Sequence, residues 1–119
     1  MKNLFLGLTL SVAALSTSSL TAASPLVGYI SDAKCATDSA SKKTAAEWIQ
    51  PARFEACVKK CVKDEGSEAV FVTEDNKILK FDAASAKKIG AFLGRKVSVI
   101  GKVSSGTIAV DSITGLKLQ

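Results

Sequence analysis

The hydrophobic pattern of the chain is most regular in its middle, where apolar residues and cysteines recur with helical spacing. The positions follow i, i+3, i+4, i+7 and i+8, and they are Phe54, Cys57, Val58, Cys61 and Val62. This spacing marks one face of an α-helix. Pro51 suits the first turn of such a helix, so we expect a helix from 52 to 64. Because Cys57 and Cys61 are one turn apart, both thiols should point toward the surface on which the helix packs.

A shorter helical segment is predicted just before this helix. Thr44 and Glu47 have the spacing of a capping box, in which each side chain accepts a hydrogen bond from the backbone N–H of the other residue. The preceding residues 36–43 are small and polar, and they predict a loop. We therefore expect a helical insertion over residues 44–65.

The remaining segments show the alternation that is typical of β-strands. Five strands are predicted, over residues 27–31, 69–73, 77–81, 96–103 and 107–111. A helix over 83–93, with Asp82 as its N-cap, should separate the third strand from the fourth. Ile113 is out of phase with Ile108 and Val110, which predicts a β-bulge near Asp111 or Ser112.

This order of elements predicts a mainly β fold with helices (α+β). Five strands with a helix between the third and fourth favour an OB-like five-stranded small barrel. The cysteine-bearing helical insertion would lie between strands 1 and 2. Phe71 and Phe81 should face the core of that barrel. An open five-stranded sheet built from the same elements is the alternative.

The N-terminal residues 1–23 have the three parts of a secretory signal peptide. Lys2 supplies the positive charge, residues 4–15 are mostly apolar, and a zone of small residues follows. The apolar run of about 12 residues is shorter than the roughly 20 that a spanning helix needs, so no membrane span is expected after cleavage. We expect one mature domain over 24–119, exported to the periplasm or the extracellular space, where thiols tend to be oxidised.

The charged and catalytic residue types limit the possible functions. The chain has 16 basic and 11 acidic residues, a net charge of +5. The basic residues are scattered and do not form the patch that nucleic-acid binding requires, so a nucleic-acid partner is disfavoured. The chain has no histidine, which excludes Cys–His and Ser–His nucleophilic mechanisms. No glycine-rich phosphate loop is present either, and we expect no enzymatic activity.

Three cysteines are the main candidates for site chemistry. An odd number in an exported chain predicts one disulfide and one free thiol. Cys35 paired with the helix would close a loop of about 20 to 25 residues, worth roughly 3 kcal/mol. We favour Cys61 as the partner of Cys35, with Cys57 as the alternative partner. On this interpretation no cofactor is needed.

A metal site is the alternative use of the same thiols. The thiolates of Cys35, Cys57 and Cys61 suit Cu(I) or, with a carboxylate as the fourth ligand, Zn²⁺. Asp32 is the first choice for that carboxylate and Asp38 the second. A thiol redox protein is the third possibility. Tyr29 and Trp48 are candidates for a ligand groove, or for packing of the inserted helix on the barrel.

The segment Gly28-Tyr29-Ile30-Ser31-Asp32-Ala33-Lys34-Cys35 carries a resemblance to a known group of proteins. Together with the helical Cys57-x-x-x-Cys61 and the final alternating hairpin, it resembles small, exported bacterial proteins of uncharacterised function. Those proteins often have Cys-Gly and a nearby histidine after the opening. This chain has Cys35-Ala36 and no histidine, so a Cys/His metal site is not carried over.

From the sequence, then, we expect an exported small binding or structural module that is stabilised by a disulfide. Its partner would be an unknown small ligand or protein. The alternative is a protein that binds or handles a metal, copper or zinc, through its thiolates.

Overall fold

A computed structural model describes residues 24–117 of the chain. The predicted signal peptide lies outside the described residues. Within them, no helix is both long and apolar enough to span a membrane.

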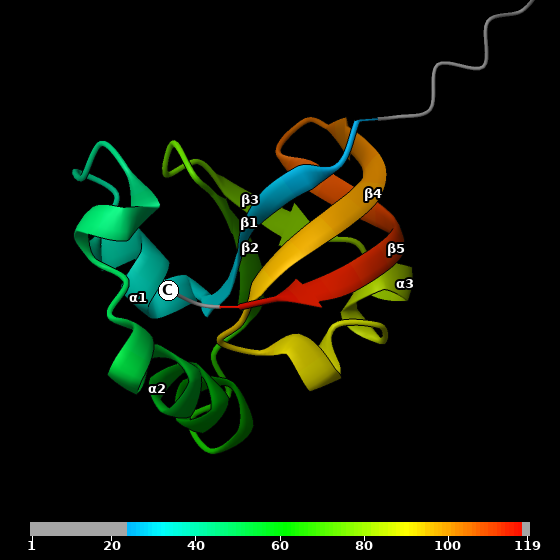
Figure 1. The fold of residues 1–119 in the computed structure, drawn as a ribbon. Coiled ribbons are helices and arrows are strands. Elements are labelled where there is room, and N and C mark those ends of the chain that lie inside the picture. The colour runs from blue at the N-terminus through cyan, green and yellow to red at the C-terminus, as the bar shows by residue number, and fades with distance from the viewer. Residues whose placement is uncertain (1–23, 118–119) are drawn as a thin grey trace, which may run out of the picture.

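Residues 24–117 form five strands and five short or medium helices (Figure 1). The strands are β1 (Leu26–Asp32), β2 (Ala69–Thr73), β3 (Ile78–Phe81), β4 (Lys96–Ser104) and β5 (Thr107–Leu116). The α-helices are α1 (Ala33–Asp38), α2 (Pro51–Lys63) and α3 (Ala83–Ala86), and the 3₁₀ helices are η1 (Ala45–Glu47) and η2 (Gly90–Phe92).

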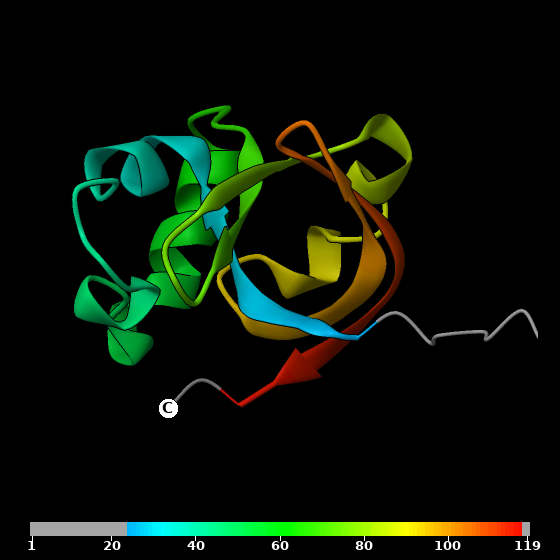
Figure 2. The ribbon, with the colours of Figure 1, turned by 90° about the horizontal axis from the view of Figure 1, so that it is seen from above.

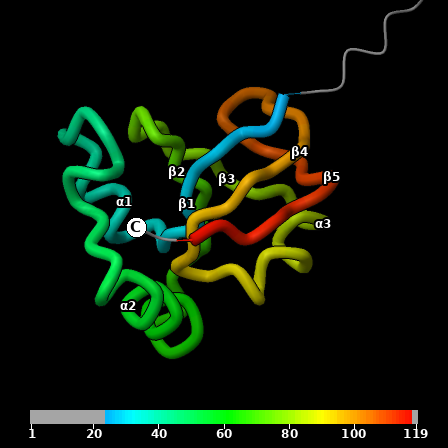
Figure 3. Tube along the Cα trace, viewed as in Figure 1, coloured from blue at the N-terminus to red at the C-terminus, as the bar shows by residue number. Residues whose placement is uncertain are grey.

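The strands close into a ring in the order β1-β2-β3-β5-β4. Figure 2 looks down this ring, and Figure 3 shows how the long β4–β5 hairpin curls around it. β1 pairs antiparallel with both β2 and β4, and the pairing of β3 with β5 closes the ring, which excludes the open sheet. The pairing of β3 with β5 is parallel and involves Lys80 with Thr107 and Phe81 with Ile108. The predicted mainly β fold with helices is confirmed, and the ring is a five-stranded barrel of the OB-like kind.

The barrel interior is filled by aromatic and β-branched side chains. Phe71 and Phe81 are buried, as predicted, and their rings meet edge to face with centroids 6.4 Å apart. Val97 and Val99 of β4 are buried with them, whereas Val103 at the far end of the same strand is 48% exposed. The valines of β4 therefore point into the barrel only before the bulge, and beyond it the alternating side chain is exposed.

The bulge itself lies where the sequence predicts it. Ile100 pairs with Ser112 and Gly101 pairs with Val110, so Asp111 is the extra residue of β5. An extra residue bends its strand and increases the local twist. The bulge thus returns Ile113 to the inner side of β5, where it packs against the core.

Three local predictions differ from the structure. The expected loop over 36–43 begins instead with helix α1. The expected helix over 83–93 is divided into α3 and η2, since Gly90 lowers helix propensity. The Thr44 side chain makes no cap hydrogen bond, and Glu47 accepts from the backbone N–H of Lys43 instead.

The helical insertion between β1 and β2 runs from 33 to 68 and is longer than the predicted 44–65. Its helices α1, η1 and α2 lie together on one side of the barrel, and α3 lies on the other side (Figures 1 and 2). Helix α2 begins at Pro51, which occupies its first turn as predicted.

Aromatic contacts fix α2 against the barrel. Phe54 of α2 meets Tyr29 of β1 and Trp48 edge to face, with ring centroids 6.2 and 6.0 Å apart. Val58, one turn further, is also buried. These contacts set the roll of α2 about its axis and so decide which cysteine faces the barrel.

Candidate metal centre

The site begins where β1 passes into α1. Asp32 is the last residue of β1 and the N-cap of α1, and its Oδ2 accepts a hydrogen bond of 3.0 Å from the backbone N–H of Cys35. An aspartate at this position satisfies a helix N–H group that otherwise lacks a partner. The cap thereby fixes the Asp32 carboxylate beside the Cys35 side chain.

The other carboxylate oxygen of Asp32 has no partner. Asp32 is 0% exposed, and no donor among residues 24–117 reaches its Oδ1. A buried carboxylate oxygen without a hydrogen bond or a cation is costly. Such an atom in a folded protein needs a specific explanation. The two cysteines nearest to it, Cys35 and Cys61, suggest that the explanation is a bound cation.

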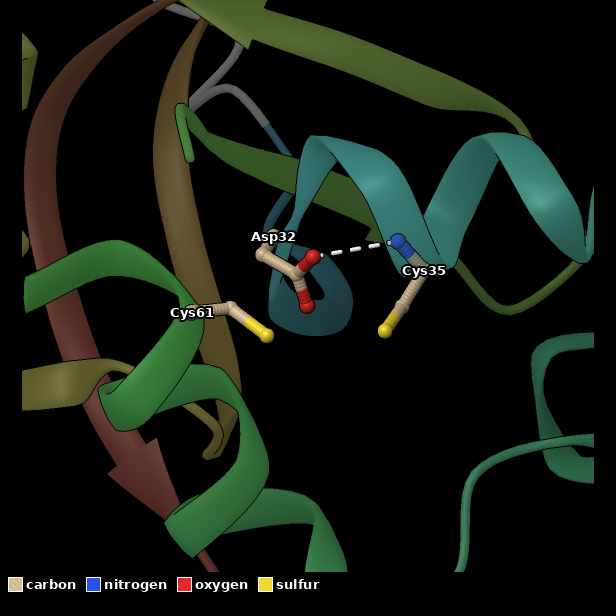
Figure 4. Close-up of side chains that lie close together, drawn as sticks. All are labelled: Asp32, Cys35 and Cys61. Atoms are coloured by element: carbon tan, nitrogen blue, oxygen red, sulfur yellow. Dashed lines mark hydrogen bonds between the residues drawn. The ribbon is translucent and has the colours of Figure 1, made fainter. Parts of the chain in front are cut away.

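Helix α2 brings the second thiol to this carboxylate. One ligand atom from each of Asp32, Cys35 and Cys61 lies within 4.8 Å of the other two. Figure 4 shows the carboxylate between the two thiols, with one of its oxygens bonded to the Cys35 N–H and the other facing the sulfur atoms. We call these three residues the Asp32–Cys35–Cys61 cluster.

The environment of the cluster keeps both thiols protonated. Burial, followed by a hydrogen bond between the thiol and the Asp32 carboxylate and by the charge of that carboxylate, raises the pKa of the Cys35 thiol from 9.0 to about 12. Burial and the same carboxylate also raise the pKa of Cys61. Nearby negative charge disfavours a thiolate, and a cation would reverse the effect. A reactive thiol needs a lowered pKa, so the raised pKa values of Cys35 and Cys61 disfavour these two thiols as redox-active groups.

Cys57 is separate from the cluster. It is exposed, whereas Cys35 and Cys61 are partly buried, and it does not belong to the group of close ligand atoms. The expectation that both helix thiols face the packing surface is therefore wrong for Cys57. Phe54 and Val58 occupy that surface, and Cys57 lies at its edge.

All three cysteines are free thiols among the described residues. The predicted disulfide joins Cys35 to Cys61, and the structure brings these two thiols together within 4.8 Å. A disulfide requires sulfur atoms about 2.05 Å apart. The pairing stays a prediction, and it competes with metal binding for the same two sulfur atoms.

A pocket of about 320 Å³ lies next to the cluster. Asp32 and Cys35 form part of its wall, Trp48, Phe54 and Val58 form the apolar part, and Cys57 is also exposed to it. Trp48 thus lines this pocket, as the ligand-groove hypothesis requires. Tyr29 is not among the pocket residues and is only 9% exposed, so its position fits the packing alternative.

Asn76 is a positioning residue that the sequence analysis missed. Its side-chain N–H groups donate to the carbonyl oxygens of Ser39 and Lys42, at 2.9 and 2.8 Å, and its Oδ1 accepts from Trp48 Nε1 at 2.8 Å. Asn76 has a positive φ of 62° in the β2–β3 turn. Asparagine tolerates a positive φ better than most residues. An asparagine in a predicted turn was therefore the signal in the sequence for this position.

Comparisons with protein-family models, with curated proteins and with solved structures found no match. The resemblance to small exported bacterial proteins therefore stays a prediction.

Proposed function

We propose that this protein is a small, non-enzymatic binding module whose ligand is a metal ion, held by Asp32, Cys35 and Cys61. The observation that carries the proposal is the unpartnered, fully buried Oδ1 of Asp32 beside two thiols. A cation at the centre of the cluster would neutralise this carboxylate and stabilise both thiolates.

The donor set favours zinc over copper. Two thiolates and one carboxylate match the ligands of Zn²⁺, with distances of about 2.3 Å to sulfur and 2.0–2.2 Å to oxygen. Cu(I) prefers soft donors alone. In a tetrahedral zinc site the two sulfur atoms are about 3.8 Å apart. The cluster, whose ligand atoms lie within 4.8 Å of one another, needs only a small contraction to reach that geometry.

A structural disulfide between Cys35 and Cys61 is the second candidate. Its support is the proximity of the two thiols and the expected export of the chain. A disulfide has no S–H and cannot donate a hydrogen bond, so Asp32 Oδ1 would keep its uncompensated charge. The metal is preferred for this reason. With the disulfide, the protein would be a stapled binding or structural module with an unknown ligand or partner.

The test compares two aspartates at the two ends of α1, the N-cap Asp32 and the last residue Asp38. The purified protein is reduced, freed of metal with a chelator and titrated with Zn²⁺ under oxygen-free conditions. We expect one equivalent to bind and the thermal midpoint to rise, as for any ligand that binds only the folded state. Asp32→Asn should lower zinc affinity by more than about 100-fold, because loss of even an outer-shell partner costs 10- to 100-fold.

Asp38→Asn is the matched control, since Asp38 also lines the pocket but lies outside the cluster. It should leave zinc affinity unchanged. The metal-free Asp32→Asn protein should be at least as stable as the wild type, because asparagine keeps the cap and removes the buried charge. Failure of the reduced protein to bind zinc, together with one free thiol when an unreduced sample of the protein as isolated is denatured without reductant, would establish the disulfide instead. Equal loss in both variants would place the metal elsewhere.

A further inference from the structure

The pocket beside the cluster connects it to Cys57. Asp32 and Cys35, two of the three cluster residues, form part of the pocket wall, and so does the exposed Cys57. The unpartnered Asp32 Oδ1 belongs to a pocket-lining residue that is itself 0% exposed. Cys61, in contrast, does not line the pocket. Of the two cysteines that line the pocket, Cys57 is thus the more exposed to solvent.

The position of Cys57 on α2 suits a ligand that exchanges a metal with the cluster. Cys57 and Cys61 lie one helical turn apart, which places their Cβ atoms about 5–6 Å from each other. A side chain at this distance is near enough to take over one coordination position. Cys57 is nevertheless outside the group of close ligand atoms, so it is not one of the three ligands of the resting site.

We propose that Cys57 is the capture and release ligand for the metal, a role that rests on the proposed zinc site. The ion first binds the Cys57 sulfur and then passes to the Asp32–Cys35–Cys61 cluster by stepwise exchange of ligands. Each thiol loses its proton to water as its sulfur bonds to the ion and displaces one coordinated water molecule. When the ion has passed to the cluster, the departing Cys57 thiolate takes up a proton from water. No electron is transferred.

The rest of the pocket is compatible with the passage of a cation. The exposed side chains of Asp38 and Arg53 supply one charge of each sign, so the pocket opening has no excess of positive charge. Trp48, Phe54 and Val58 give an apolar wall without competing ligand atoms. Within the pocket, the soft donor nearest to solvent is thus Cys57.

The test measures equilibrium and kinetics on the same variants. The zinc-loaded protein is mixed with an excess of a chromogenic zinc chelator, and the transfer rate is followed by absorbance. For Cys57→Ser we expect unchanged equilibrium affinity and transfer in both directions slower by about 10-fold or more, because a tethered exchange partner acts at an effective concentration near the millimolar range.

The control moves the thiol to another face of the same helix. The double variant Cys57→Ser with Ala56→Cys keeps an exposed cysteine on α2, but Ala56 does not line the pocket. It should transfer zinc as slowly as Cys57→Ser alone.

Wild-type rates in Cys57→Ser, or restored rates in the double variant, would overturn the proposal. A fall of about 10-fold or more in equilibrium affinity would also overturn it, because that is the effect expected when a resident ligand is lost. Failure of the proposed function is distinct from all of these, since the wild-type protein would then take up no zinc.

Discussion

Among single residues, Asp32 has the largest effect on the chemistry of the site. It caps α1 with one oxygen and presents the other, unpartnered, to the thiols of Cys35 and Cys61. The same carboxylate helps to raise the pKa of both thiols. In the metal-free protein the carboxylate therefore opposes ionisation of the thiols, and in the metal-bound protein the ion reverses that effect.

The raised pKa values predict how zinc affinity depends on pH. The Cys35 pKa is about 12 and that of Cys61 is also raised, so both thiols are protonated near neutral pH and each must lose its proton to bind the ion. Affinity should rise with pH by about 100-fold per unit between pH 6 and 8, one factor of ten for each proton released. Calorimetry in buffers of different ionisation enthalpy counts these protons.

Cys61→Ser is the informative comparison, because one ligand thiol is removed and the other remains. Its residual zinc binding should change by about 10-fold per pH unit. A wild-type affinity that does not vary with pH would mean that the two thiols are not the ligands.

The residues of the site were only partly predictable from the sequence. The thiols of Cys35 and Cys61 and the carboxylate of Asp32 could be nominated as ligands by residue type. The exclusion of Cys57 could not be predicted, because one turn of α2 separates it from Cys61 and the roll of the helix is set by tertiary contacts. One of those contacts, of Phe54 with Tyr29, joins residues 25 positions apart in the sequence.

At the scale of elements, the docking of α2 depends on a close approach of backbones. Gly94 follows η2 with a φ of +72°, and a Cβ at this position would overlap the backbone of Glu55 in α2. The turn that carries Gly94 is also bonded to β1, through Gly94 N and Ile30 O at 2.8 Å. The absence of a side chain at Gly94 thus allows α2 to lie against β1 and its neighbours.

Two glycines with the same backbone conformation allow this contact to be tested. Gly66, at the end of α2, has a φ of +71° and no atom within 4 Å of the position of a Cβ. Gly66→Ala should destabilise the fold by about 1–2 kcal/mol for the left-handed conformation. Gly94→Ala should cost about 2–5 kcal/mol, because overpacking adds about 1–3 kcal/mol, and it should also weaken zinc binding. Urea denaturation of both variants makes the comparison, and equal losses would contradict the close packing of α2.

The strands were more predictable than the helices. Alternation located all five strands and the bulge at Asp111, because the side chains of a strand that lines a barrel alternate between inside and outside. The short helix α1 was missed, since its six residues hold too few turns to show a period. The N-cap residue Asp32 was the feature of the sequence that indicated α1. Gly90, a weak helix former, indicated that the helix after Asp82 would be interrupted.

At the scale of the whole molecule, stability depends on the aromatic pair inside the barrel. Phe71 is 0% and Phe81 9% exposed, and they come from the neighbouring strands β2 and β3. Phe71→Ala and Phe81→Ala should each reduce the free energy of unfolding by about 3–5 kcal/mol. Val103→Ala is the control, because this side chain is exposed, and it should change stability by less than about 0.5 kcal/mol. Chemical denaturation measures all three, and a phenylalanine variant as stable as the wild type would refute the core assignment.

The order of the elements was sufficient to predict a mainly β fold with helices. The closure of the strands into a barrel could be seen only in the folded structure. Closure depends on which strands meet at the ends of the sheet, a contact between β1 and β4 and another between β3 and β5. Neither contact joins consecutive strands, so no local turn in the sequence encodes it. The insertion between β1 and β2 was predicted, but its position over the barrel depends on packing that only the folded chain defines.

The short parallel pairing of β3 with β5 has a consequence for association between copies of the protein. Strands that lack a neighbour can pair with the strands of another molecule and start aggregation or domain exchange. The ring protects every strand from this, but the protection at β3 and β5 consists of two residue pairs, against nine for β4 with β5. A fluctuation that opens the ring should therefore begin between β3 and β5, and it would expose two unpaired strand edges at once. We therefore expect a single chain to be most open to polymerisation at this seam between β3 and β5.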